Sequence, residues 1–400
     1  RFKSIFNGNN AARAGGAIYV RETAINNTIT SEFNNNIAKE ASGGGIFFYK
    51  TAENNKIESI FTNNIAAYGA GMFFYSESNN NKISSDFKNN TALSCGGAIF
   101  FYSKTNNNSF KGNFINNTAK GLIDKNNANG GAITFKNTSK NCIFDCNFTG
   151  NTAILNGGAV NYRTTSYNIT FKGNFIANSA PNGGGLNFFN EFNNITFNCN
   201  FIDNNAIFGG GICINKEESS SNSSGKTDSD HIQTVTNCNF TNNNATKGGA
   251  IYTTGSLTLN NLTFVDNYAT KEGGAICLYS DVTLNCDNTD FTDNYAEAGS
   301  AIYVEKGKLN LYNAELSSKI FNKYSQIAAL RHSVINIENV TFANSTSSYS
   351  PAMYLRNTKT SIINSKFYNL RGNITAGAIG IRLGGEIYIK NCEFINTTSS

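Results

Sequence analysis

The chain has 400 residues and a formal net charge of +5, and only 15% of its residues are charged. An ordinary soluble domain carries about 25% charged residues. Here amides supply the polarity instead, with 69 Asn beside 37 Gly and 2 Pro. Asn and Gly tolerate left-handed backbone conformations, so the composition favours a chain that turns often and disfavours a helical protein. The scattered cations exclude a nucleic-acid-binding run, and no apolar stretch is long enough to span a membrane.

A six-residue motif, Phe-x-x-Asn-x-Ala, recurs along the first three quarters of the chain with its three fixed positions intact. After most copies comes a second motif, Gly-Gly-(Ala/Gly)-(Ile/Val/Leu), as at Gly96-Gly97-Ala98-Ile99. The first motif begins at Phe6, Phe33, Phe61, Phe87, Phe114, Phe148, Phe175, Phe201, Phe240, Phe264 and Phe291. Such regular recurrence indicates a repeat protein in which each unit packs on its neighbours.

Within each repeat, apolar residues alternate with others after the Gly pair, which is typical of a strand. We therefore predict an all-β fold, a single-stranded parallel β-helix of about 14 coils of roughly 26 residues. The Phe should stack inside the lumen, and the Asn should bind local backbone or the Asn of the next coil at a corner. Ala and Gly should lie where backbones approach closely. The representative structural residues are Phe87, Asn90, Ala92, Gly96, Gly97, Phe264, Asn267, Ala269, Gly273 and Gly274.

The repeat predicts one continuous β-helix over residues 1–400, and the opening Arg1 suggests a segment of a longer chain. Residues 306–400 are predicted to be degenerate coils of the same solenoid. There Leu316 stands where Phe is due, and Ala328-Ala329-Leu330 is interpreted as the substitute for Gly-Gly-Ala-Ile. Residues 215–236 lack core residues and are predicted to form a polar loop insertion.

The paired motifs resemble the repeat of the chlamydial polymorphic outer membrane proteins. The Asn-rich style of Phe114–Ala119 and Phe240–Ala245 is especially similar to adhesin-like surface proteins of methanogenic archaea. The resemblance is strong over about residues 1–305 and weak beyond them. It implies a right-handed β-helix in an extracellular or cell-surface protein, and it names no ligand.

Aromatic residues gather in two adjacent columns of the first four coils, at positions that should face outward and form a large apolar patch on a solvent face. They are Tyr19, Phe47, Tyr49, Phe73, Tyr75, Phe100 and Tyr102. One interpretation is a binding platform for a glycan or a protein, since flat aromatic side chains suit both. The alternatives are stacked rings that stabilise a sheet face, or a face covered by sequence outside this segment.

Acidic residues raise the possibility of an enzyme. Asp203, Asp266 and Asp293 each lie two residues after a motif Phe, and stacked coils would bring neighbouring carboxylates close together. Asn288-Thr289-Asp290 is similar to a triplet of β-helix polygalacturonases. However, Asp and Asn exchange freely at corners, and the histidines are His231, in the polar insertion, and His332, in a degenerate coil. We therefore expect no catalytic residues, no metal site and no cofactor.

Cysteines recur two residues before a Phe, at Cys146, Cys199, Cys238 and Cys392. This position should face inward, so we expect a column of packed thiols. A disulfide between Cys199 and Cys238, which belong to consecutive coils, is the alternative.

Three functions are compatible with this sequence. The first is a cell-surface, adhesin-like stalk that attaches by many weak contacts to a glycan or surface protein of a host or neighbouring cell. The second is a structural subunit that binds copies of itself in an extracellular filament or sheath. The third is a polysaccharide lyase or hydrolase. The repeat favours the first, because coils can be added or lost without redesign of a core.

Overall fold

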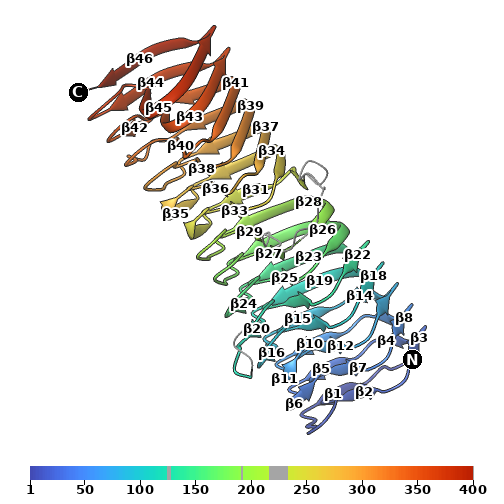
Figure 1. Cartoon of the computed structure of the whole chain (residues 1–400). Coiled ribbons are helices and arrows are strands. Elements are labelled where there is room, and N and C mark those ends of the chain that lie inside the picture. The colour runs from blue at the N-terminus through green and yellow to red at the C-terminus, as the bar shows by residue number, and fades with distance from the viewer. Residues whose placement is uncertain (124–127, 191, 216–232, 400) are drawn as a thin grey trace. The chain divides into compact units, whose positions relative to one another are not determined.

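The computed structural model describes residues 1–123, 128–190, 192–215 and 233–399. Every regular element in these ranges is a β-strand, and the strands form a parallel β-solenoid of about 14 turns with a spacing of roughly 26 residues (Figure 1). The predicted all-β parallel β-helix is thus confirmed, while its right-handed sense stays a prediction. The chain divides into two compact units, Arg1–Cys199 and Asn200–Ser400. Each is described by itself below, and a continuous helix through both stays a prediction.

In the first unit, strands at equivalent places of successive repeats pair in parallel, so that Phe6 pairs with Phe33 and Phe33 with Phe61. The strands that carry the motif Phe are β1 (Ile5–Asn7), β5 (Glu32–Asn34), β10 (Ile60–Thr62), β15 (Asp86–Lys88), β19 (Ser109–Ile115), β23 (Ile143–Thr149) and β26 (Ser166–Ile176). Those after the Gly pair are β2 (Ile18–Val20), β7 (Ile46–Phe48), β12 (Met72–Phe74), β17 (Ile99–Phe101), β21 (Ile133–Phe135), β25 (Val160–Tyr162) and β27 (Leu186–Phe189).

Shorter strands complete each turn of the first unit. They are β3 (Ala24–Ile25), β8 (Ala52–Glu53), β13 (Ser78–Asn79), β18 (Thr105–Asn106) and β22 (Ser139–Lys140), then β4 (Thr28–Ile29), β9 (Lys56–Ile57) and β14 (Lys82–Ser84). A five-stranded sheet follows the motif Asn and consists of β6 (Ile37–Ser42), β11 (Ile65–Tyr68), β16 (Thr91–Ala92), β20 (Thr118–Ala119) and β24 (Thr152–Ala153). By sequence, β28 (Phe192–Ile202) contains the boundary between the units.

The second unit repeats this plan with longer strands. After the Gly position come β29 (Ile212–Asn215), β33 (Ile251–Thr253), β36 (Ile276–Tyr279), β38 (Ile302–Glu305), β40 (Ile327–Leu330), β43 (Met353–Ile363) and β45 (Ile379–Lys390). The Phe position lies on β31 (Asn239–Thr241), β34 (Leu257–Val265), β37 (Thr283–Thr292), β39 (Lys308–Ser317), β41 (Val334–Ala343), β44 (Lys366–Gly372) and β46 (Glu393–Ser399). The remaining strands are β30 (Gln233–Thr236), β32 (Asn244–Lys247), β35 (Tyr268–Glu272) and β42 (Thr346–Ser347).

The motif Asn forms a buried ladder of side-chain amides, as predicted. The Asn90 Nδ2 donates to the Phe61 carbonyl and to the Asn117 Oδ1, both at 2.9 Å. Its Oδ1 accepts from the Asn64 backbone N at 3.1 Å and from the Asn64 Nδ2 at 2.9 Å. This fully buried carboxamide thus donates two hydrogen bonds from its nitrogen and accepts two at its oxygen. In the second unit, Asn267 makes the equivalent bonds to Asn294 and to the Phe240 carbonyl.

The motif Phe side chains stack along the lumen with nearly parallel rings. The Phe87 ring centroid lies 4.7 Å from that of Phe61 and 4.8 Å from that of Phe114. Phe264 lies 4.9 Å from Phe240 and 5.0 Å from Phe291. The motif alanines Ala92 and Ala269 are fully buried. These features confirm the structural roles predicted for the Phe and Ala positions.

The Gly pair serves two separate needs. Gly96 has φ +65° and Gly273 has φ +63°, in the left-handed region that favours glycine. Gly97 is required by close approach, since a Cβ there would lie 1.9 Å from the Gly131 carbonyl oxygen of the next coil. A Cβ on Gly274 would lie 2.1 Å from the Ser300 carbonyl oxygen. The first glycine therefore turns the chain, and the second lets neighbouring backbones approach.

A second Asn ladder, which the motif search missed, follows another corner of the first unit. The Nδ2 of Asn55 donates to the Asn81 Oδ1 at 2.9 Å, and that of Asn81 donates to the Asn108 Oδ1 at 3.0 Å. In the sequence, the signal for this ladder is an Asn-Asn pair. In the structure, the first Asn of the pair has a positive φ, as Asn80 does at 55°. The same pair builds the motif ladder, where Asn89 also has φ 55°.

Two details of the degenerate region and the insertion differ from expectation. Leu316 pairs with Phe291 as predicted, but Ala328 and Ala329 pair with Tyr303 and Val304 inside a strand. The residues opposite Ser300-Ala301 are Ser325-Gln326, because burial of Ile327 opposite Ile302 sets the register. Both ends of the predicted insertion lie in strands, since Asn215 ends β29 and Gln233–Thr236 form β30. Residues 216–232 lie outside the described residues.

The cysteine column faces inward, as expected: Cys146, Cys199 and Cys238 are buried, and Cys392 is half-buried. Serine or glycine takes the same place in the early coils, for example Ser31 and Gly112, which aligns with Cys146. The position holds a small residue in these coils, whereas the buried Leu262 and Val340 occupy it in later ones. Cys199 and Cys238 belong to different units, so the choice between packed thiols and a disulfide stays a prediction.

We predict that Asn90→Ala lowers the free energy of unfolding by about 3 kcal/mol or more, because it leaves buried donors on Asn64 and buried acceptors on Phe61 and Asn117 without their partner. Urea unfolding followed by circular dichroism measures the loss. The exposed Lys88→Ala, on the neighbouring strand β15, is the control and should change stability by no more than about 0.5 kcal/mol. Equal stability of the two variants would contradict the role given to the ladder.

Burial raises the pKa of the Cys142 thiol from 9.0 to about 11. The pKa of this thiol is higher in the folded than in the unfolded state, so the unfolded chain loses its proton first as the pH rises. The contribution of the thiol to stability is therefore complete below pH 9 and is lost as the pH rises through about 11. Between these values the loss should reach about 2 to 3 kcal/mol. We predict that Cys142→Ala flattens the alkaline fall of the unfolding free energy by that amount. Parallel pH curves for the two proteins would count against it.

Candidate functional site

The predicted aromatic residues lie on β2, β7, β12 and β17 of the first unit or directly after these strands, where corresponding residues of successive coils are paired. Side chains alternate across these strands. Phe48, Phe74 and Phe101 stack in the lumen, with centroids 4.7 to 4.8 Å apart. The predicted site residues therefore belong to the opposite face, as the sequence indicated.

The structure corrects the expectation that all seven aromatic side chains are exposed. Phe47, Phe73 and Phe100 are 8%, 4% and 2% exposed and form a core cluster outside the lumen. The cluster includes Cys95, and Ala14, Tyr68 and Tyr102 pack against it. Ala14, Tyr68 and Cys95 each come just before the first glycine of the turn. Alternation along a strand predicts only which face a side chain takes, and here the turn before the Gly pair covers that face.

The tyrosines remain accessible. Those directly after Phe48, Phe74 and Phe101 form a column of their own, whereas Tyr19 pairs with Phe47. Tyr19, Tyr49 and Tyr75 are 41%, 40% and 41% exposed, and Tyr102 is half-buried. The Tyr75 centroid lies 5.2 Å from that of Tyr49 and 5.0 Å from that of Tyr102, with ring planes within 14° of parallel. We call Tyr49, Tyr75 and Tyr102 the tyrosine row. The facing sides of neighbouring rings therefore lie against one another along the row.

A cation ends the tyrosine row on the side of the later coils. The Lys136 Nζ lies 3.7 Å from the centroid of the Tyr102 ring, a cation–π contact. The backbone N of Lys136 donates to the Phe101 carbonyl, and that of Arg163 donates to the Phe135 carbonyl. Lys136 and Arg163 therefore continue the column in the next two coils. The sequence interpretation missed both, although each directly follows the lumen-facing aromatic residue of its repeat.

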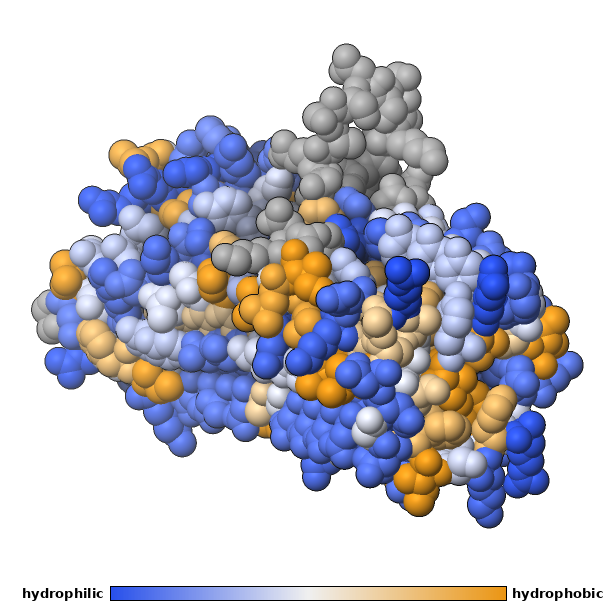
Figure 2. Space-filling view, turned by 90° about the horizontal axis from the view of Figure 1, so that it is seen from below, coloured by the Kyte–Doolittle hydropathy of each residue, from blue (hydrophilic) through white to orange (hydrophobic). Residues whose placement is uncertain are grey.

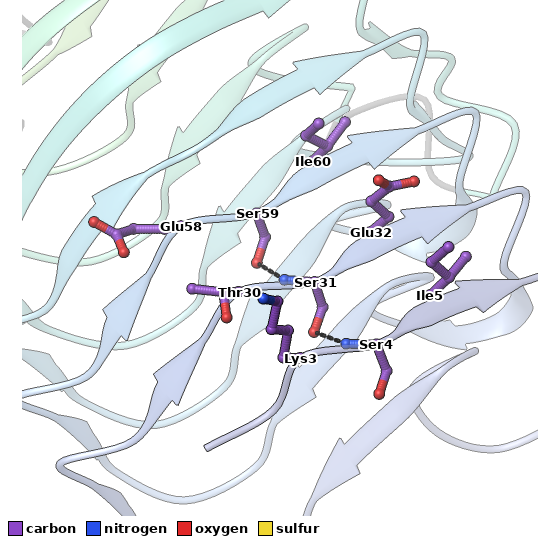
Figure 3. Close-up of a pocket in the computed structure, with 9 residues that line it drawn as sticks. All are labelled: Lys3, Ser4, Ile5, Thr30, Ser31, Glu32, Glu58, Ser59 and Ile60. Atoms are coloured by element: carbon purple, nitrogen blue, oxygen red, sulfur yellow. Dashed lines mark hydrogen bonds between the residues drawn. The ribbon is translucent and has the colours of Figure 1, made fainter.

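A separate open groove of about 440 Å³ lies beside the first coils (Figure 3). Its floor contains a serine ladder, in which the Ser4 backbone N donates to the Ser31 Oγ at 3.2 Å and the Ser31 backbone N donates to the Ser59 Oγ at 3.1 Å. The full lining consists of Lys3, Ser4, Ile5, Thr30, Ser31, Glu32, Glu58, Ser59 and Ile60. These serines occupy the small-residue position that becomes Cys146 later, so their bonds support the corner.

In the second unit, the position equivalent to Phe47 carries a mixed polar cluster. Cys277 and Tyr303 are buried there, and the Tyr303 hydroxyl donates to the buried Glu305 carboxylate at 2.7 Å. Arg331 forms an ion pair with the same carboxylate. Burial raises the pKa of the Tyr303 hydroxyl well above its ordinary value. The position of Phe47, Phe73 and Phe100 is therefore buried in the second unit as well, at Cys277 and Tyr303, although the side chains there are partly polar.

The acidic candidates occupy corner positions. Asp203, Asp266 and Asp293 have φ 56°, 54° and 52°, the conformation of the first residue in the Asn-Asn pairs. The Asp293 Oδ1 accepts a hydrogen bond from the Lys319 backbone N at 2.7 Å.

The other predicted enzyme features also have structural partners. Asp290 accepts from the Glu315 backbone N at 2.9 Å, and His332 contacts the Asn357 side chain at 3.1 Å. His231 lies outside the described residues.

Hydrophilic residues dominate the face seen in Figure 2, and hydrophobic residues appear there in separate groups. Within the described ranges, no helix has the length and apolar character needed to cross a membrane.

Comparison with known families confirms the resemblance of the repeat to that of the polymorphic outer membrane proteins. The model of the Chlamydia polymorphic membrane protein repeat matches residues 3–21, 84–102, 237–254 and 261–279. Each segment covers a motif Phe and the Gly pair after it. The chain therefore carries polymorphic membrane protein-type repeats, which imply an outer-membrane or surface protein. No curated protein matches the chain.

We predict that Phe73→Ala lowers the free energy of unfolding by about 3 to 5 kcal/mol, because it opens a cavity in a buried cluster. Tyr75→Ala removes a partly exposed ring and two stacking contacts, so its loss should be roughly 1 to 2 kcal/mol. Chemical unfolding of the two variants tests the distinction between the covered and exposed columns. A smaller loss for Phe73→Ala than for Tyr75→Ala would show that the phenylalanine column is not core.

Proposed function

We propose that this protein is an extracellular, cell-surface adhesin that attaches to a glycan or surface protein through multiple non-covalent contacts, without catalysing a reaction. The tyrosine row carries the proposal, because it is an accessible aromatic column beside the buried Phe47, Phe73 and Phe100. The polymorphic membrane protein-type repeats and the β-solenoid support a surface role.

The architecture suits attachment by many weak contacts. Backbone pairing between coils fixes the tyrosines at intervals of 5.0 to 5.2 Å, so a partner meets several rings in a constant arrangement. Aromatic rings bury a large area with few rotatable bonds, which limits the entropy lost on binding. Linked contacts then act together, and the combined affinity exceeds that of any one of them.

We predict that replacing Tyr49, Tyr75 and Tyr102 together by Ser abolishes retention of the full chain on intact cells and on immobilised polysaccharides. Labelled protein, mixed with each surface and washed, measures retention. The matched control is Tyr268→Ser with Tyr295→Ser, a stacked pair of the second unit whose rings lie 5.1 Å apart. The control should bind as the unaltered protein does, and circular dichroism should show that both variants keep their strands.

Two results would oppose adhesion. Failure of the unaltered chain to bind any surface would remove support for it. Sedimentation velocity measures self-association of the same samples at rising concentration. Self-association that disappears in the tyrosine variant would assign the row to assembly of a filament or sheath instead.

A further inference from the structure

The tyrosine row forms the middle of a longer column whose ends are cationic. Arg21 precedes it, because Val20 pairs with Phe48 and the next residues are Arg21 and Tyr49. Lys136 and Arg163 follow it, held by the backbone bonds described above. We call the six positions Arg21, Tyr49, Tyr75, Tyr102, Lys136 and Arg163 the cationic aromatic column. All six belong to the first unit.

The charge along this column is strongly biased towards the positive. Within the column and the two residues after each member, the side chains of Arg21, Lys50, Lys104, Lys136 and Arg163 are cationic, and those of Glu22 and Glu77 are anionic. Glu22 forms an exposed ion pair with Lys50 at 2.5 Å, which neutralises one charge of each sign. The remaining excess of cations attracts an anionic partner.

The ring arrangement restricts the kind of partner. A neutral sugar packs its C–H face on an open aromatic face, and a nucleic-acid base also needs such a face. Here the facing sides of neighbouring tyrosine rings lie against one another, and Lys136 lies over the Tyr102 ring. The three tyrosines also carry phenol hydroxyls, which donate hydrogen bonds. The column therefore suits a partner that presents hydrogen-bond acceptors in a line.

We propose that the cationic aromatic column binds a linear anionic polysaccharide, with carboxylate or sulfate groups that pair with the cations and accept from the tyrosine hydroxyls. The tyrosines repeat every 5.0 to 5.2 Å, a spacing similar to the length of one pyranose unit in an extended chain. Successive sugars can thus meet successive coils. This inference rests on the proposed adhesion and specifies its ligand class.

Binding of the full chain to heparin, polygalacturonate and neutral dextran, each immobilised, tests the proposal. We expect retention on the two anionic polymers and none on dextran. Raising the salt from about 0.1 M to about 1 M should release the protein, because the Debye length falls from about 10 Å to about 3 Å.

Two variants locate the site. Arg21→Gln, Lys136→Gln and Arg163→Gln together should weaken binding at least about tenfold. The charge-matched control, Lys82→Gln with Lys88→Gln and Lys172→Gln, replaces exposed cations on β14, β15 and β26 and should retain most of the affinity. Replacing the three row tyrosines by Phe keeps the ring stack but removes the hydroxyls, and should weaken binding several-fold.

The outcomes separate this inference from the proposed function. Retention on dextran, equal weakening by the control variant, or capture by protein-coated surfaces alone overturns the anionic polysaccharide and leaves adhesion intact. No retention of the unaltered chain on any polymer, protein or cell surface overturns both. The site is established if retention on the anionic polymers is sensitive to salt and is lost in the variant of Arg21, Lys136 and Arg163 but not in the charge-matched control.

Discussion

The coils that carry the Phe-x-x-Asn-x-Ala motif depend on the hydrogen bonding of the buried motif Asn side chain. The Asn90 amide links the coils before and after its own and leaves no strong donor or acceptor of the group unused. An unpaired amide would be costly inside the fold, so the ladder fixes the register of each coil against the next. An apolar residue could fill the volume but could not align successive corners in this way.

Fixed register turns a repeat in sequence into columns in space. A residue type that recurs at one position becomes a continuous row, whether of Phe rings in the lumen or of tyrosines outside it. Weak contacts therefore accumulate along a row without any single deep pocket. The same property lets the second unit replace a phenylalanine cluster with Cys277, Tyr303 and Glu305, because a column can change while the ladders stay.

Much of the fold could be predicted because its signals are local and repeated. The motif residues Phe87, Asn90 and Gly97 each have one physical role, and many copies make the pattern unmistakable. The prediction of exposure failed at Phe73, where a neighbouring turn covers the side chain. Alternation along a strand shows which face of the sheet a side chain takes, but not what packs against that face. Prediction also failed at Ala328, where the weakened motif no longer marked the register and the buried Ile327 decides it.

The amino-acid sequence by itself determined the strand content, the coil length, the lumen-facing residues and the corner residues. Each of these follows from steric preference and hydrophobic period within a single repeat. Only the tertiary structure decided that Phe47 is covered while Tyr49 is accessible, and that Lys136 lies over Tyr102. Exposure and side-chain contact depend on residues about one coil apart, and no property of a single repeat encodes how its neighbour covers it.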